Sequence, residues 1–157
     1  VVFITPRNHP LTKYARFQDN QSFPWIDLSL FSGERFILPA EEQSLRRYSN
    51  QILKGCSVQP KEVLTLRKIF IIIGLVNNGY GVGFSLVGYI NWSRNIDNVS
   101  IFSVIDPAVT ATFYAIYKKG RRLSPAASSL IDMVKEKINQ QVRDIRKDSY
   151  VHPQSSI

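Results

Sequence analysis

The sequence is poor in the residues on which most catalytic and metal sites depend. Its 157 residues include one cysteine, Cys56, and two histidines, His9 and His152. A serine or cysteine nucleophile needs a base within reach, and a zinc site needs several cysteine or histidine ligands, so we expect no enzyme, no metal and no cofactor. A lone cysteine forms no internal disulfide, which favours a reducing compartment, and we expect a cytoplasmic protein.

A basic leader segment and a convincing membrane span are also absent from the sequence. The chain opens on an apolar run and its single methionine is Met133, so we expect a fragment of a longer protein without a signal peptide. The uncharged stretch 69–90 is long enough to cross a bilayer, but it contains Asn77, Asn78 and five glycines. Because a polar turn at mid-bilayer is unfavourable, we expect no membrane partner.

Positive charge is concentrated near the C-terminus. The chain carries a net charge of +8, and between positions 118 and 147 nine Lys and Arg residues outnumber three Asp and Glu residues, a net +6. A basic segment can bind nucleic acid. No helix-turn-helix, zinc finger or arginine-rich repeat accompanies the charge, so a solvated helix face next to a basic turn is the simpler interpretation. A nucleic-acid-binding module remains an alternative.

Hydrophobic periodicity predicts strands that alternate with helices. Runs of β-branched and aromatic residues predict strands at 1–5, 35–38, 61–66, 82–86, 99–105 and 110–117. Helical spacing predicts helices at 45–55, at 69–76 and after Ser124, where a hydroxyl precedes Pro125 at the first helical position. The alternation favours one compact α/β domain of about five strands, in a largely parallel sheet with helices on both faces.

The same patterns give local expectations. Gly55 stands where a helix C-cap belongs, and Arg46 falls outside the apolar stripe of its helix. The apolar helix 69–76 should be buried on most sides, and 91–98 should be loop. The strand 110–117 should lie beside the first strand of the chain.

Five short stretches follow one another in an order typical of one protein family. They are Val2–Pro6 with His9-Pro10-Leu11, Asp27-Leu28 with Arg35–Pro39, Ser44–Arg47, Leu75–Val82, and Thr112–Lys118 with Gly120–Ala127. The last, a strand, a basic turn and a Leu-Ser-Pro-Ala-Ala helix start, is the most specific. In this order they resemble the effector-binding domain of LysR-type transcriptional regulators over roughly residues 1–140.

The resemblance implies a fold like that of the type-II periplasmic binding proteins, a mostly parallel sheet flanked by helices. It implies effector-binding subdomain II with its crossover strands at 1–123, the C-terminal helix of subdomain I at 124–147, and a tail at 148–157. The chain would sense a small-molecule effector, form a homo-oligomer, and reach DNA only through a winged-helix domain that this sequence lacks. A solute-binding protein of a transport system with the same fold is the alternative, and the Leu-Ser-Pro-Ala-Ala segment favours the regulator.

Candidate ligand contacts lie beyond the carboxyl ends of the strands, where open α/β sheets bind ligands. This rule and the resemblance point to seven residues: Pro39, Ala40, Glu41, Ser44, Arg67, Phe84 and Ser85. Arg67 and Lys68 precede the helix 69–76, where cations and free N–H groups suit a carboxylate or phosphate. Glu41 and Glu42 across the cleft would oppose an anion, so we expect an anionic or a zwitterionic effector.

Overall fold

The computed structural model describes residues 1–17, 22–93, 96–104, 114–120 and 122–148, with the backbone alone for 141–148. The chain divides into two compact units, Val1–Thr110 and Ala111–Ile157, which corrects the expectation of a single compact domain. The first unit holds a sheet with its helices, and the second holds one long helix. The sequence pattern predicted this amphipathic helix, but such a pattern does not identify the surface that the helix covers. It therefore could not show that the helix belongs to a separate unit.

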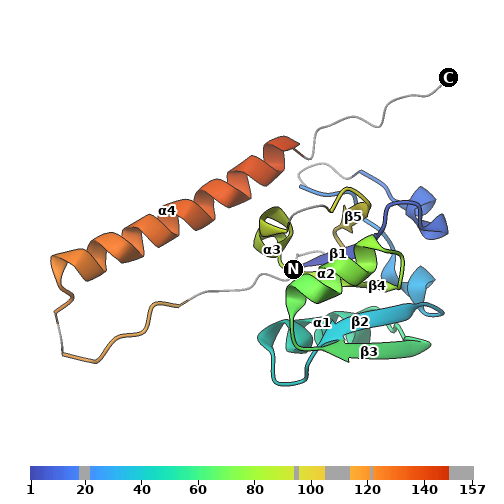
Figure 1. Cartoon of the computed structure of the whole chain (residues 1–157), viewed down its shortest axis with the longest axis horizontal. Coiled ribbons are helices and arrows are strands. Elements are labelled where there is room, and N and C mark those ends of the chain that lie inside the picture. Colours follow the sequence, from blue (N-terminus) through green and yellow to red (C-terminus); the bar gives the residue numbers. More distant parts are fainter. Residues whose placement is uncertain (18–21, 94–95, 105–113, 121, 149–157) are drawn as a thin grey trace. The chain divides into compact units, whose positions relative to one another are not determined.

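Five strands form one sheet in the order β3-β2-β4-β1-β5. Their bounds are β1 Val2–Pro6, β2 Arg35–Pro39, β3 Glu62–Leu66, β4 Val82–Ser85 and β5 Val99–Phe102. β2 pairs in parallel with β3 and β4, whereas β1 runs antiparallel between β4 and β5 (Figure 1). The predicted α/β fold is confirmed, as a mixed sheet in which β1 alone is reversed.

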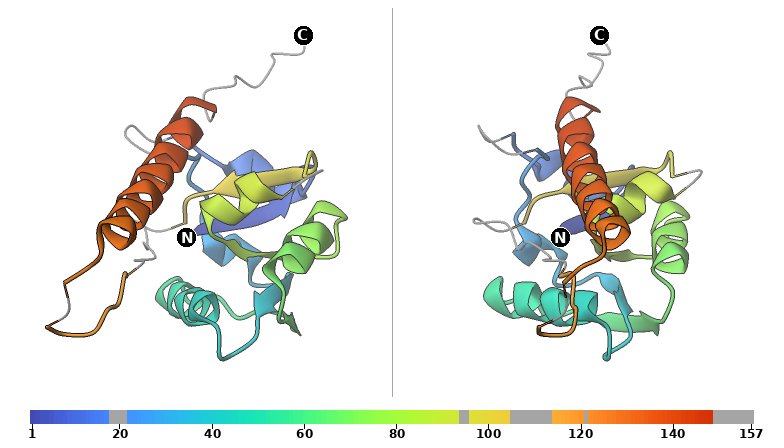
Figure 2. Two further views of the ribbon diagram at one scale, coloured as in Figure 1. Left: turned by 60° about the vertical axis from the view of Figure 1, so that its left-hand side comes forward. Right: turned by 90° about the vertical axis from the view of Figure 1, so that its left-hand side faces the viewer.

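Helices cover both faces of this sheet. Their bounds are α1 Ser44–Gly55, α2 Ile69–Asn77 and α3 Val87–Trp92, with short 3-10 helices η1 Pro10–Tyr14 and η2 Leu28–Phe31. Phe3 and Phe36 join a core with η2 and α1, whereas their neighbours Ile4 and Ile37 join a second core with α2 and α3. Figure 2 shows α1 and α2 on opposite sides of the sheet. Apolar residues at successive strand positions are what a sheet buried on both faces requires.

Three local expectations are wrong. α1 runs through Gly55, and the residue with a left-handed backbone just after this helix is Ser57, with a φ of 54°. Asn91 belongs to α3, which at six residues is too short for a helical period to be recognised. On α2, the side chains of Phe70 and Ile71 are 50% and 49% exposed, because only the opposite side of this helix meets the sheet.

The expected pairing of strand 110–117 with the first strand is also wrong for its described part. β1 has β4 on one edge and β5 on the other, so no edge is left for another strand. Tyr114–Tyr117 form no strand, and the rest of the predicted strand lies outside the described residues. Composition identified both segments as β-prone, but β-propensity does not select a partner strand.

Two glycines let β4 lie close to β2. A Cβ on Gly83 would be 2.6 Å from the carbonyl oxygen of Ile37, and a Cβ on Gly81 would be 2.6 Å from that of Arg35. Any side chain at either position would push the two strands apart. The backbone of β4 therefore reaches its place beside β2 because these positions lack a side chain.

The second unit contains α4, which spans Pro125–Asp148. The backbone N–H of Ala127 donates to Ser124 Oγ at 3.2 Å, which confirms the predicted N-cap. Leu130, Val134 and Ile138 recur at a spacing of four residues and are exposed. α4 therefore carries an apolar stripe along one side.

Candidate functional site

The candidate site is a pocket at the carboxyl ends of β2, β3 and β4, where each strand leads into a helix. Its volume is about 590 Å³, and it lies wholly within the first compact unit. The lining residues are Gln43, Ser44, Leu45, Arg67, Lys68, Ile69, Phe70, Ile71, Leu86 and Tyr89. This is the edge at which open α/β sheets bind ligands, and the volume suits a small organic molecule.

α1 and α2 both begin at this pocket, and Leu86, the N-cap residue of the short helix α3, also lines it. Gln43 and Lys68 are the N-cap residues of α1 and α2, and within the described part of the chain no side chain caps either helix. The first N–H groups of a helix have no intrahelical acceptor, and the helix dipole makes this end partly positive. The pocket can therefore accept an anionic group at two places.

The seven predicted site residues divide into two groups. Ser44 and Arg67 line the pocket, and Glu41 is exposed on the loop between β2 and α1. The other four are buried: Pro39, Ala40, Phe84 and Ser85. Phe84 and Ser85 are fully buried, and Leu86 just beyond them lines the pocket instead. The pocket lies at the edge of the sheet that the sequence indicated, and a ligand contact by any of the seven residues stays a prediction.

Arg67 ties the two loops at the pocket mouth together. Its Nη2 lies 3.5 Å from Oε1 of Glu42, and its carbonyl oxygen accepts a hydrogen bond from Nε2 of Gln43. The two charged side chains are 84% and 60% exposed, so their ion pair is worth about 0–1 kcal/mol. Lys68 is exposed beside it, and no acidic side chain among the described residues pairs with it.

Arg46 is the important residue that sequence reasoning missed, because it is buried rather than on the solvent side of α1. Its Nη2 lies 2.6 Å from Glu41 Oε1, and its Nη1 donates to the Pro39 carbonyl oxygen at 2.8 Å and to Thr65 Oγ1 at 3.3 Å. Its Nε donates to Asn50 Oδ1 at 2.9 Å. One guanidinium thus joins α1 to the ends of β2 and β3. The sequence signal for this role was Asn50, which lies four residues after Arg46 and therefore on the same side of the helix, where it can bind the guanidinium.

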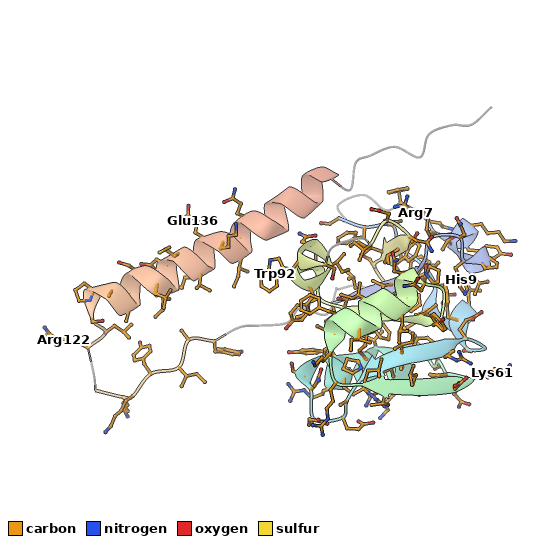
Figure 3. The ribbon with its side chains drawn as sticks, viewed as in Figure 1. Arg7, His9, Lys61, Trp92, Arg122 and Glu136 are labelled. Carbon is orange, nitrogen blue, oxygen red and sulfur yellow. The ribbon has the colours of Figure 1, made fainter. Side chains whose placement is uncertain are left out.

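An aromatic row forms one wall of the pocket and continues past it. The rings of Phe70 and Tyr89 meet edge to face, with centroids 5.9 Å apart and planes at 79°. Trp92, labelled in Figure 3, extends the row with its ring centroid 6.1 Å from that of Tyr89. Such edge-to-face pairs fix aromatic rings in place. The wall is therefore an apolar surface at the N-terminal end of α2.

Within the described residues, other kinds of site find little support. No group of three or more His, Cys, Asp and Glu side chains could hold a metal ion there. No helix in that part of the chain is long and apolar enough to cross a membrane. Burial, and secondly the charge of Asp27, raise the pKa of the half-buried Cys56 thiol, which disfavours the reactive thiolate.

A family model of the LysR substrate binding domain matches residues 1–139 of the chain. The chain belongs to the LysR substrate-binding domain family. This result confirms the family indicated by the order of motifs, and it does not favour the transport-protein alternative. Among curated proteins, none matches the chain.

Solved domains of the LysR family share the fold. The effector binding domain of QuiR in complex with shikimate is 22% identical, with a TM-score of 0.57 over 83% of this chain and 57% of that one. The Synechocystis PCC6803 CcmR regulatory domain in complex with 2-PG is 16% identical, with a TM-score of 0.60 over 84% and 59%. The BenM effector binding domain with its effector benzoate is 19% identical, with a TM-score of 0.51 over 68% and 45%. This LysR-family chain therefore spans less than two thirds of the length of each.

Proposed function

We propose that this chain is the effector-sensing part of a LysR-type transcriptional regulator. The observation that carries the proposal is the pocket where β2, β3 and β4 end, in a chain of the LysR substrate-binding domain family. The proposed role is regulatory rather than catalytic, is exercised in the cytoplasm and needs no cofactor. DNA would be bound by a winged-helix domain N-terminal to this segment, and not by residues of the segment itself.

The proposed division of the chain follows from that role. Residues 1–123 would form subdomain II with the crossover strands, residues 124–147 the C-terminal helix of subdomain I, and residues 148–157 a tail. The start of α4 at Pro125 supports the second boundary. The effector would be a small molecule bound in this pocket, with Ser44 and Arg67 among its contacts.

Ser44→Asp tests this function directly. We expect benzoate at millimolar concentration to shift the backbone amide resonances of Ser44, Leu45, Ile69 and Phe70 of the 157-residue chain in a saturable manner. The substituted carboxylate stabilises the start of α1 by about 0.3–1 kcal/mol, so the variant should fold, but it occupies the anion position. Binding should therefore weaken at least about tenfold, which corresponds to a lost charge-assisted contact of about 1.4 kcal/mol.

Ser128→Asp is the matched control for Ser44→Asp. Ser128 is exposed in the first turn of α4, so the added charge meets a helix dipole without entering the pocket. Its benzoate affinity should equal that of the original chain. If neither benzoate, shikimate nor inorganic phosphate shifts the pocket amides at 20-fold excess, the proposed function fails.

We also propose that the protein forms a homo-oligomer. The stripe on α4 leaves Leu130 61%, Met133 66% and Val134 49% exposed, and contiguous exposed apolar surface promotes association. Sedimentation velocity at tens of micromolar should show a dimer or a larger species. Val134→Lys should shift the distribution toward monomer, whereas a strict monomer before substitution would contradict the proposal.

A further inference from the structure

The pocket wall is divided into a polar end and an apolar end. The polar lining residues come from the loops that precede α1 and α2 and from their first positions: Gln43, Ser44, Arg67 and Lys68. The apolar end is formed by α2 and by the junction of β4 with α3: Phe70, Ile71, Leu86 and Tyr89. A ligand that matches both ends must itself have a charged or polar group and a hydrocarbon part.

The charges around the polar end leave one cation in excess. Glu41 lies 2.6 Å from Arg46, and Glu42 lies 3.5 Å from Arg67, so both acids have a basic partner. Lys68 has no acidic partner among the described residues and is exposed at the pocket. Glu41 therefore does not oppose an anion as the sequence led us to expect, and the balance favours a ligand with a single negative charge rather than a zwitterion.

Two side chains of the apolar end are exposed, whereas the opposite side of their helix is buried. Phe70 and Ile71 are 50% and 49% exposed, whereas Ile72, Ile73 and Val76 on the same helix are fully buried. The exposed pair is continuous with a pocket of about 590 Å³, a size typical of small-molecule sites. This continuity points to the hydrocarbon part of a small ligand as the group that covers the two side chains.

We propose, as an extension of the proposed function, that the effector is an organic monocarboxylate with a hydrocarbon body. Its carboxylate lies at Lys68 and Ser44, and its hydrocarbon part covers Phe70 and Ile71. Small polyhydroxylated acids satisfy the polar end but leave the apolar end exposed. Hydrocarbon alcohols satisfy the apolar end but leave Lys68 without a counter-ion.

The test compares ligands that differ at one end only, with nuclear magnetic resonance titration of the 157-residue chain. Cyclohexanecarboxylate and shikimate share a six-membered ring and a carboxylate, and only shikimate carries hydroxyl groups. We expect cyclohexanecarboxylate to bind at least about fivefold more tightly than shikimate. In the series from butanoate to octanoate, affinity should rise about two- to fourfold per methylene, because each methylene is transferred from water to the apolar wall.

Two variants assign the two ends of the ligand. Phe70→Ser should make the affinity rise less steeply with the chain length of the acid. The affinity for butanoate should stay within about twofold, because butanoate is so short that it buries about one methylene or less against Phe70. Lys68→Gln should lower the affinity of octanoate to that of octanamide. Phe17→Ser, at a side chain 73% exposed, and Lys54→Gln, at an exposed position of α1, are the matched controls and should change neither.

Each contrary outcome has a separate meaning. If pocket amides respond equally to shikimate and to cyclohexanecarboxylate, the hydrocarbon class is wrong while the proposed function stands. If no probe moves them, the proposed function itself fails. Shifts of the same amides with protein concentration alone would assign the apolar end to a second copy of the chain and overturn the inference. Octanoate shifts confined to α4 would overturn it as well.

Discussion

Replacing Arg46 with methionine should lower the free energy of unfolding by about 2–4 kcal/mol. Methionine keeps the unbranched apolar stem, but it leaves the buried Pro39 carbonyl oxygen and the Thr65 hydroxyl without the guanidinium that now binds them. The arginine side chain is 10% exposed and that of Glu41 is 71% exposed, so most of the loss arises from the buried Pro39 carbonyl oxygen, which loses its donor, rather than from the ion pair.

Urea denaturation followed by tryptophan fluorescence measures this loss, and Arg47→Met is the matched control. Arg47 is the next residue of α1, is exposed, and lies over the Tyr48 ring at 5.7 Å. Its substitution should change stability by less than about 1 kcal/mol. Equal losses in the two variants would show that the Arg46 contacts add no more stability than a surface arginine does.

Phe84→Ala should cost about 3–5 kcal/mol, the largest effect that we expect from a single substitution in this chain. Phe84 is fully buried in β4, and its ring centroid lies 5.4 Å from that of Phe3 and 6.1 Å from that of Phe36. Truncation leaves a cavity at the centre of the aromatic core. The prediction also decides between a core role and the ligand contact inferred from the sequence.

If the alanine variant does not fold, the Phe84→Leu variant still allows the free energy of unfolding to be measured. Leucine fills more of the space and should cost about 1–2 kcal/mol. Phe17→Ala, at a side chain 73% exposed, should leave the midpoint of unfolding unchanged. A Phe84→Leu variant with full stability and weakened benzoate binding would instead assign Phe84 to the ligand.

The sequence predicted most elements because each carries its own local signal. The runs that form β1 to β5 are rich in β-branched and aromatic residues, and Ser124 with Pro125 marks the start of α4. The reversal of β1 could not be predicted. A strand buried on both faces has the same apolar sequence whether its neighbours run parallel or antiparallel, so only the tertiary structure sets its direction.

The candidate site was predicted in position but not in composition. Ser44 and Arg67 follow from the rule that ligands bind beyond the strand ends, and both line the pocket. Tyr89 was missed because α3 is too short to show a period, and Leu86, the residue before α3, was placed at the end of the predicted strand 82–86. Arg46 was missed because a charged residue one position off an apolar stripe normally faces water, and only its partners on β2 and β3 make burial favourable.

The place of β4 between β2 and β1 has a consequence for the energetics of recognition. A central strand opens only when the sheet as a whole unfolds, so its amide protons should be among the slowest to exchange with solvent. Leu86, the residue after β4, is therefore attached to the most persistent part of the molecule, while Arg67 and Lys68 follow the edge strand β3. On ligand binding, conformational entropy is then lost mainly at Arg67 and Lys68, because the backbone at Leu86 is already ordered before the ligand binds.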